Sequence, residues 1–243
     1  MFAKIGIIVV SLVLTLLLVV TINTLQLRSQ QIDVVPVAAI DINADSAARR
    51  LAEAIQFRTV SREPGSPPAK DALRGFHDFL GRSFPKVHDT LTREVINEHS
   101  LLYTWQGTDP GLKPILIAAH MDVVPVEAGT EDEWTHPPFG GVIADGFIWG
   151  RGTMDMKTSL MGILEAVEYR IDEGVTPEKT VYLAFGHDEE VGGPNGAAQI
   201  SELLRSRGVT IDFTLDEGLV ITGGIVPGVC LTSAPLGLFE VIA

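Results

Sequence analysis

An apolar run that ends in a histidine and an aspartate constrains the fold more than any other feature of the sequence. Ile115 to Ala119 are all apolar, and His120 and Asp122 follow directly. A short apolar run of this kind predicts a buried strand, and open α/β sheets gather their functional residues at the C-terminal ends of such strands. We therefore expect an imidazole and a carboxylate at one edge of a buried sheet.

The same pattern recurs twice further along the chain. Thr180 to Phe185 and Ile211 to Leu215 are further predicted strands, and each runs into acidic residues. The acidic residues are Glu189 and Glu190 after the first strand and Asp216 and Glu217 after the second. Apolar periodicity predicts helices between them, over 158–173, with Gly174 as its stop, and over 197–207. Strands and helices alternate, which predicts an α/β fold with a mostly parallel sheet.

A hairpin introduces one more carboxylate. Asp145-Gly146 predicts the turn between two short strands, 142–143 and 147–149. The chain then passes through Gly150-Arg151-Gly152 to Asp155, which we expect at the start of a helix. Asp155 and His120 are thus predicted to lie on separate elements.

The segment before the central strand is predicted to be scaffolding. Ser46 is expected to cap a short helix that ends at Ile55, and a second helix is expected over 70–80. The apolar residues on one face of this second helix are Leu73, Phe76, Phe79 and Leu80. Strands are expected over 90–95 and 101–106.

The N-terminal segment is predicted to meet a membrane. From Ile5 to Ile22 every residue is apolar, Gly, Ser or Thr, with Lys4 before the run and Arg28 after it. About 18 such residues suffice to cross a hydrocarbon core. We expect a single-pass signal anchor over 1–27, a linker over 28–43 and a catalytic domain over 44–243 on the extracytoplasmic side. Cleavage of the segment would instead make the protein secreted.

Composition excludes some classes of function. A net charge of −13 argues against a nucleic-acid partner. The one cysteine, Cys230, forms no intrachain disulfide, fits no zinc-cysteine spacing and is expected to be a buried apolar residue. Each acidic cluster alone is more often a solvated turn, and an isolated His-x-Asp more often a packed histidine. The argument for a site is that all of them follow apolar strands, where carboxylates would repel each other without a cation.

Imidazole and carboxylate donors suit zinc, with manganese or cobalt as substitutes. Two metals would need one shared carboxylate, for which Asp155 is a candidate. Asp122 is placed to accept the second ring N–H of a metal-bound His120. Of Glu189 and Glu190, one can bind metal while the other acts as a general base.

These residues carry a resemblance to a known family. The motifs are His120-Met121-Asp122-Val123-Val124-Pro125, Trp134 with Pro138-Phe139, Gly150-Arg151-Gly152-Thr153-Met154-Asp155-Met156-Lys157, Asp188-Glu189-Glu190-Val191-Gly192-Gly193 and Leu215-Asp216-Glu217-Gly218. They resemble the dinuclear-zinc metallopeptidase family of aminoacylase-1, carboxypeptidase S and succinyl-diaminopimelate desuccinylase, and most of all the branch of carboxypeptidase S and the N-acyl-amino-acid hydrolases. The resemblance begins near Ala44 and implies a three-layer sandwich around a mostly parallel mixed sheet, as in zinc exopeptidases.

The resemblance also implies roles for these residues. His120 and Glu190 would bind different zinc ions, Asp155 would bridge the two, Asp122 would be the catalytic aspartate and Glu189 the base. Glu217 would be the next ligand, with Asp216 as the alternative. The implied reaction is hydrolysis of an amide bond, in a short peptide or an N-acyl amino acid, by a water that bridges the metals.

The resemblance places one more metal-binding histidine and a lid domain, through which family members dimerise, beyond Ala243. The chain is therefore expected to be the N-terminal part of the enzyme and inactive on its own. The alternative is a catalytically inactive, membrane-tethered binding module of the same fold. Hydrolysis of a sugar or phosphate ester has no support from a glycine-rich phosphate loop.

Overall fold

The computed structural model describes residues 2–26, 42–217 and 238–239. The chain divides into two compact units, residues 1–41 and 42–243. Nearly all of the predicted linker, and Cys230, lie outside the described residues. The predicted domain limits of 1–27, 28–43 and 44–243 stay predictions.

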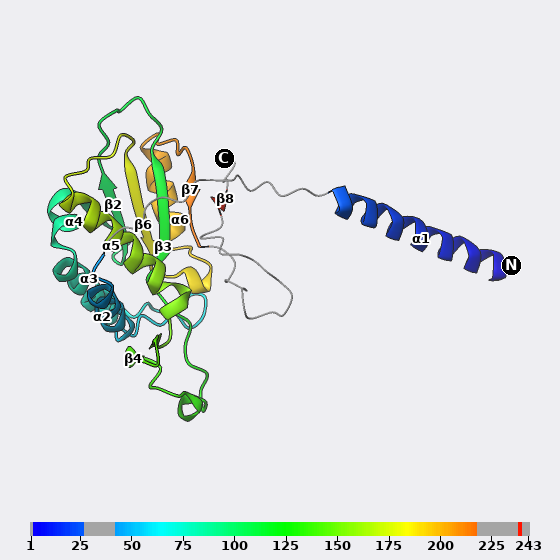
Figure 1. Cartoon of the computed structure of the whole chain (residues 1–243), viewed down its shortest axis with the longest axis horizontal. Helices are drawn as coiled ribbons and strands as arrows, with labels where there is room; N and C mark the ends of the chain where they lie inside the picture. The colour runs from blue at the N-terminus through cyan, green and yellow to red at the C-terminus, as the bar shows by residue number, and fades with distance from the viewer. Residues whose placement is uncertain (1, 27–41, 218–237, 240–243) are drawn as a thin grey trace. The chain divides into compact units, whose positions relative to one another are not determined.

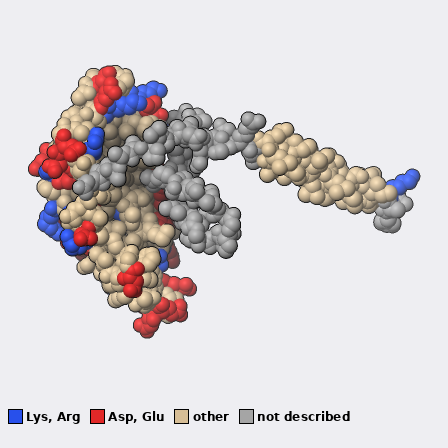
Figure 2. All heavy atoms as spheres, viewed as in Figure 1, with Lys and Arg blue, Asp and Glu red and all other residues tan. Residues whose placement is uncertain are grey.

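The first unit contains the helix α1, Phe2–Gln26. Within its stretch Lys4–Gln26, a window of 18 residues has a mean hydropathy of 3.1, and none of that window is buried. Figure 2 shows the helix without acidic side chains and with a basic one at its N-terminal end. Two of its hydroxyl groups are satisfied inside the helix, since Thr15 donates to the carbonyl of Ser11 and Thr24 to that of Val20. Its length and composition allow α1 to cross a membrane. A signal sequence can have the same length and composition.

The second unit is built on a six-stranded sheet in the order β1-β2-β6-β3-β7-β8 (Figure 1). The strands are β1 (Thr92–Ile96), β2 (Ser100–Trp105), β3 (Ile115–His120), β6 (Val181–Gly186), β7 (Thr214–Leu215) and β8 (Leu238–Phe239). β3 pairs in parallel with β6 and β7, and the other three pairings are antiparallel. β1, β6, β3 and β7 therefore point the same way, which is the mixed sheet that was predicted. A separate two-stranded hairpin contains β4 (Val142–Ala144) and β5 (Phe147–Trp149).

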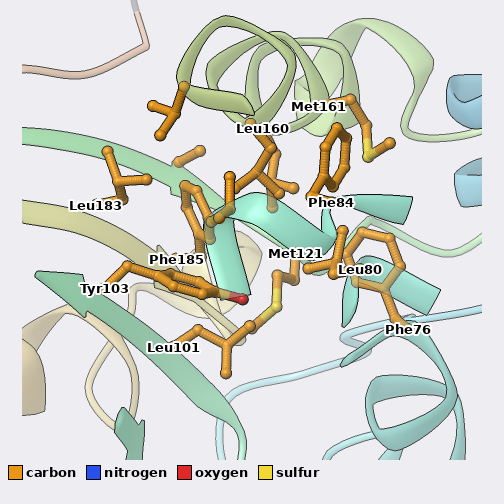
Figure 3. Close-up of a cluster of buried hydrophobic side chains, with 14 of the residues drawn as sticks. Phe76, Leu80, Phe84, Leu101, Tyr103, Met121, Leu160, Met161, Leu183 and Phe185 are labelled. Carbon is orange, nitrogen blue, oxygen red and sulfur yellow. The ribbon is translucent and has the colours of Figure 1, made fainter. Parts of the chain in front are cut away.

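Helices cover both faces of the sheet, so the three-layer α/β sandwich is confirmed. One layer contains α2 (Ala44–Ile55), α3 (Lys70–Ser83), α4 (Pro85–Thr90) and α5 (Thr158–Asp172). Their apolar faces bury a large cluster with β2, β3 and β6, in which Tyr103 and Phe185 of the sheet lie near Leu160 of α5 (Figure 3). On the other face α6 (Ala197–Ser206) packs Ile200 and Leu204 against the sheet.

The structure corrects one predicted helix cap. Asn43, and not Ser46, caps α2, because the Asn43 side chain accepts the N–H of Ser46 at 3.0 Å. Asparagine and serine are equally good caps, and the helix begins three residues earlier than the serine alone suggests. The predicted stop of α5 at Gly174 is confirmed, with a φ of +72° and the N–H of Val175 bonded back to Arg170.

The short helix α4 was not predicted, and its cap comes from a distant residue. Pro85 occupies its first turn, where the missing N–H costs nothing. The carboxylate of Glu168 on α5 accepts the N–H groups of Lys86 and Val87 at 3.1 and 2.8 Å. Because the cap lies about 80 positions away, local sequence patterns do not reveal this helix.

Candidate active site

His120 and Asp122 lie at the C-terminal end of β3, and both residues are about 1% exposed. The ring atom Nδ1 of His120 lies 2.9 Å from the main-chain carbonyl oxygen of Asp122 and 3.4 Å from its carboxylate. The main-chain oxygen is thus the nearer acceptor for the ring N–H, whereas the sequence suggested the carboxylate. This contact fixes the ring so that Nε2 faces the other acidic residues.

The carboxylate of Asp122 reaches the segment that follows the neighbouring strand β6. Its two oxygens accept the main-chain N–H groups of Glu189 and Glu190 at 3.0 and 3.2 Å. Burial alone would raise the pKa of Asp122, but hydrogen bonds from His120 and Ser61 outweigh it, and the pKa is lowered. The charged carboxylate of Asp122 therefore holds the main chain at Glu189 and Glu190 in place.

Asp155 lies in an irregular turn, Thr153–Lys157, that precedes α5, so it is not at the start of a regular helix as predicted. Gly152 makes this turn possible, because its φ is +81° and a Cβ there would lie 2.3 Å from the Cγ1 atom of Val123. The close approach brings Asp155 over the end of β3. Its Oδ1 atom lies 2.9 Å from Nε2 of His120, and its side chain is largely exposed.

The structure brings together five of the seven site residues singled out from the sequence, namely four of the five expected ligands and the expected base Glu189. One group contains His120, Asp155 and Glu190, and a second contains His120, Glu189 and Glu217, with the potential ligand atoms of each group within 4.8 Å of one another. Asp122 is in neither group, but its carboxylate is hydrogen-bonded to the main chain of Glu189 and Glu190. The carboxylate of Asp216 accepts the N–H of Glu217 and belongs to neither group.

Crowding of carboxylates dominates the electrostatics of the site. Burial, with the nearby charge of Asp155, raises the pKa of Glu190 to about 7, and burial also raises the pKa of Glu189 and of Glu217. Burial lowers the pKa of His120, but Asp122, Asp155 and Glu217 outweigh it and raise the pKa to about 9. Negative charge is thus in excess, and a bound cation would relieve it.

The donor set fits zinc. It consists of one imidazole nitrogen and carboxylate oxygens, without sulfur, at the open end of a rigid strand. Both groups share the single Nε2 atom of His120, which can bind one metal only. Within the described residues His187 belongs to neither group, and its Nδ1 atom lies 2.6 Å from the hydroxyl of Ser100.

Sequence reasoning missed the position of Lys157. This lysine is fully buried, and its ammonium group donates to the main-chain oxygens of Ala54 and Phe57 at 3.0 and 2.7 Å. Burial lowers its pKa to about 7. Lys157 thus ties the turn that carries Asp155 to the end of α2.

By fold and by the make-up of its site, the chain is an α/β domain with a candidate metal site at the C-terminal end of a parallel strand. The sequence profile of the peptidase family M20/M25/M40 matches residues 116–231. The chain is 41% identical over 249 residues to a probable carboxypeptidase S-like 2 of Dictyostelium discoideum, covering 98% of this chain and 48% of that protein. It is 46% identical over 190 residues to the N-fatty-acyl-amino acid synthase/hydrolase PM20D1.1 of Danio rerio, covering 77% and 36%.

Carboxypeptidase S of Saccharomyces cerevisiae is 39% identical over 170 residues, which cover 67% of this chain and 30% of that protein. The chain thus spans about half, or less, of the length of these curated relatives. Among solved structures, human carnosine dipeptidase 1 has a TM-score of 0.56 at 16% identity, covering 73% of this chain and 39% of that one. The metallo-carboxypeptidase Sso-CP2 of Sulfolobus solfataricus also has a TM-score of 0.56, at 20% identity, covering 72% and 38%. Both show the same fold.

Proposed function

We propose that this chain carries metal ligands and the general base of a zinc-dependent hydrolase that cleaves amide bonds in short peptides or N-acyl amino acids. One observation carries the proposal. His120, Asp155 and Glu190, from three separate segments, place their potential ligand atoms within 4.8 Å of one another beside Glu189. A grouping of this kind from distant parts of the chain is costly without a cation and useful with one.

His120 and Glu190 would bind zinc ions, Asp155 would be shared between two of them, and Glu217 would supply a further oxygen. The geometry favours Glu217 over Asp216, whose carboxylate accepts a main-chain N–H. Manganese or cobalt would be accepted as substitutes, because the donors are nitrogen and oxygen. Bound zinc would supply Lewis-acid polarisation of the amide carbonyl and a lower pKa for water.

Glu189 is proposed as the general base. Its side chain is about half exposed, and one of its oxygens lies 3.8 Å from Nε2 of His120, so it lies beside the proposed metal ligands and is open to solvent. Its raised pKa suits a group that accepts a proton from the attacking water and returns it to the leaving nitrogen. The carboxylate of Asp122 holds the main chain at Glu189 in place by accepting the N–H group of Glu189.

The substrate proposal draws on the names of the relatives, a carboxypeptidase S and an N-fatty-acyl-amino acid synthase/hydrolase. Both kinds of substrate contain an amide next to a free carboxylate. We further propose that α1 anchors the protein in a membrane with residues 42–243 outside the cytoplasm, because Lys4 precedes the apolar stretch. If the segment is cleaved, the same domain would be secreted.

The test compares Glu189→Gln with Glu190→Gln in the full-length protein. Glu189→Gln should keep the metal content and lose about 100- to 10,000-fold in kcat, as expected for loss of a general base. Glu190→Gln should lower the metal content, measured by elemental analysis after gel filtration. The opposite pattern would exchange the two roles. A wild-type protein that binds metal without hydrolysing either substrate class would support the inactive, membrane-tethered module instead.

A further inference from the structure

Hydrogen bonds within the loop that carries Glu189 and Glu190 hold its parts together. We call residues 187–196, which follow β6, the glutamate loop. The main-chain oxygen of Asp188 accepts the N–H groups of Val191 and Gly193 at 3.2 and 2.8 Å, and its carboxylate accepts the N–H of Asn195 at 2.8 Å. Because these bonds join both ends of the loop, a displacement at its far end is transmitted to the glutamates.

The rear of this loop rests on the turn between β1 and β2, residues 97–100, which we call the hairpin turn. The Nδ1 atom of His187 lies 2.6 Å from the hydroxyl of Ser100. The two residues are 4% and 0% exposed, so water does not compete for this hydrogen bond. The ring of His187 also meets the ring of His99 edge-on, with 5.2 Å between the centroids.

Two further contacts join the hairpin turn to the glutamate loop. The side-chain amide of Asn97 donates to the main-chain oxygen of Asn195 at 3.0 Å. At Gly196 a Cβ atom would lie 3.0 Å from the hydroxyl of Ser100 and 2.5 Å from the carboxylate of Asp188. The loop therefore touches the turn so closely that a side chain larger than hydrogen does not fit.

The hairpin turn is itself held in place. The ring of His77 on α3 lies with its Nε2 atom 2.9 Å from the main-chain oxygen of His99. β1 and β2 pair over five positions on either side of the turn, from Thr92 with Thr104 to Ile96 with Ser100. The turn is thus fixed to a helix and a sheet, and it can hold a neighbouring loop still.

We propose that the hairpin turn is a brace for the active site, in which Ser100, His187 and Asn97 are positioning residues for Glu189 and Glu190. Asp122 holds the glutamate loop from the side of the metal site, and the hairpin turn holds it from behind. The proposal rests on the proposed function, because it concerns the same two glutamates.

The size of the effect follows from how metal sites respond to changes behind their ligands. Removal of a group that orients a ligand typically costs about 10- to 100-fold in metal affinity. Ser100→Ala and His187→Leu each remove the buried hydrogen bond and should weaken metal binding by about that factor. His187→Asn keeps a hydrogen-bonding atom close to the position of Nδ1, so it should retain most of the affinity.

Cobalt(II) titration of the full-length protein measures this effect, because the visible spectrum of bound cobalt reports coordination geometry and not stability. Ser206→Ala is the matched control, since it also removes a serine hydrogen bond, to Leu203, but on the exposed end of α6. We expect weaker binding and an altered spectrum for Ser100→Ala and His187→Leu, and wild-type behaviour for His187→Asn and Ser206→Ala. Unchanged affinity and spectrum in the first two variants would overturn the proposal.

Hydrogen exchange tests the brace without reference to metal or turnover. In Ser100→Ala, peptides that cover residues 187–193 should exchange faster than in the wild type, while peptides from α5 should not change. Equal exchange in the glutamate loop would overturn the brace even if the protein hydrolyses amides. If the wild type binds no cobalt, the proposed metal chemistry fails, and faster exchange of the loop would still support the brace.

Discussion

Substitution of Gly152 tests quantitatively how closely the turn that carries Asp155 approaches the end of β3. The φ of +81° at Gly152 is a left-handed conformation, which costs a residue with a Cβ roughly 1–2 kcal/mol. The new Cβ would also lie 2.3 Å from the Cγ1 atom of Val123, a contact that a shift of the buried Val123 side chain or of the backbone must relieve. Overpacking of this kind adds about 1–3 kcal/mol, so Gly152→Ala should lose about 2–5 kcal/mol of unfolding free energy.

Gly174→Ala is the matched control. Gly174 has a φ of +72°, but a Cβ there would meet no atom within 4 Å. It should therefore lose only the conformational part, roughly 1–2 kcal/mol. The difference between the two variants isolates the contact of Gly152 with Val123, the neighbour of Asp122.

Urea unfolding of the full-length chain in detergent, followed by tryptophan fluorescence, measures both variants. Trp105, Trp134 and Trp149 all lie in the second unit, so α1 adds no signal. Gly152→Ala should also weaken metal binding, because relief of the contact moves Asp155 away from the end of β3. Equal losses for Gly152→Ala and Gly174→Ala, with equal metal affinity, would refute the reasoning.

Three further predictions concern other parts of the second unit. Glu217→Gln should lower the affinity for metal in a chelator competition and Asp216→Asn should not, and the reverse result would make Asp216 the ligand. Burial, then the charge of Arg93, lowers the pKa of His77 to about 4, below the value of 6.5 in the unfolded chain. The stability that neutral His77 contributes is therefore complete above pH 6.5 and is lost as the pH falls toward 4, by about 1–2 kcal/mol for this partly buried ring. His77→Gln should remove that loss in unfolding experiments at several pH values, and parallel curves for the two proteins would contradict it. Glu168→Ala should cost about 1–2 kcal/mol, because two N–H groups of α4 lose their acceptor, and an unchanged urea midpoint would argue against this cap.

Local patterns in the sequence determined most of the elements and their order, with α4 as an exception. Apolar runs of five or six residues marked β3 and β6, because a buried strand needs no polar face. The Asp145-Gly146 turn and the stop at Gly174 followed from the backbone freedom of glycine. The sequence also placed His120 at the end of a strand. Because parallel strands present their C-terminal ends at one edge of the sheet, this position predicted a site there.

Only the tertiary structure decided the contacts that join these elements. The carboxylate of Asp122 accepts N–H groups 67 and 68 positions away, and its main-chain oxygen, not its carboxylate, is the nearer acceptor for His120. A sequence pattern states which residues follow a strand but not which way each side chain turns. Lys157 and Glu168 show the same limit, because each satisfies main-chain groups of a distant helix. Such partners are chosen by packing, which brings together atoms that are far apart along the chain.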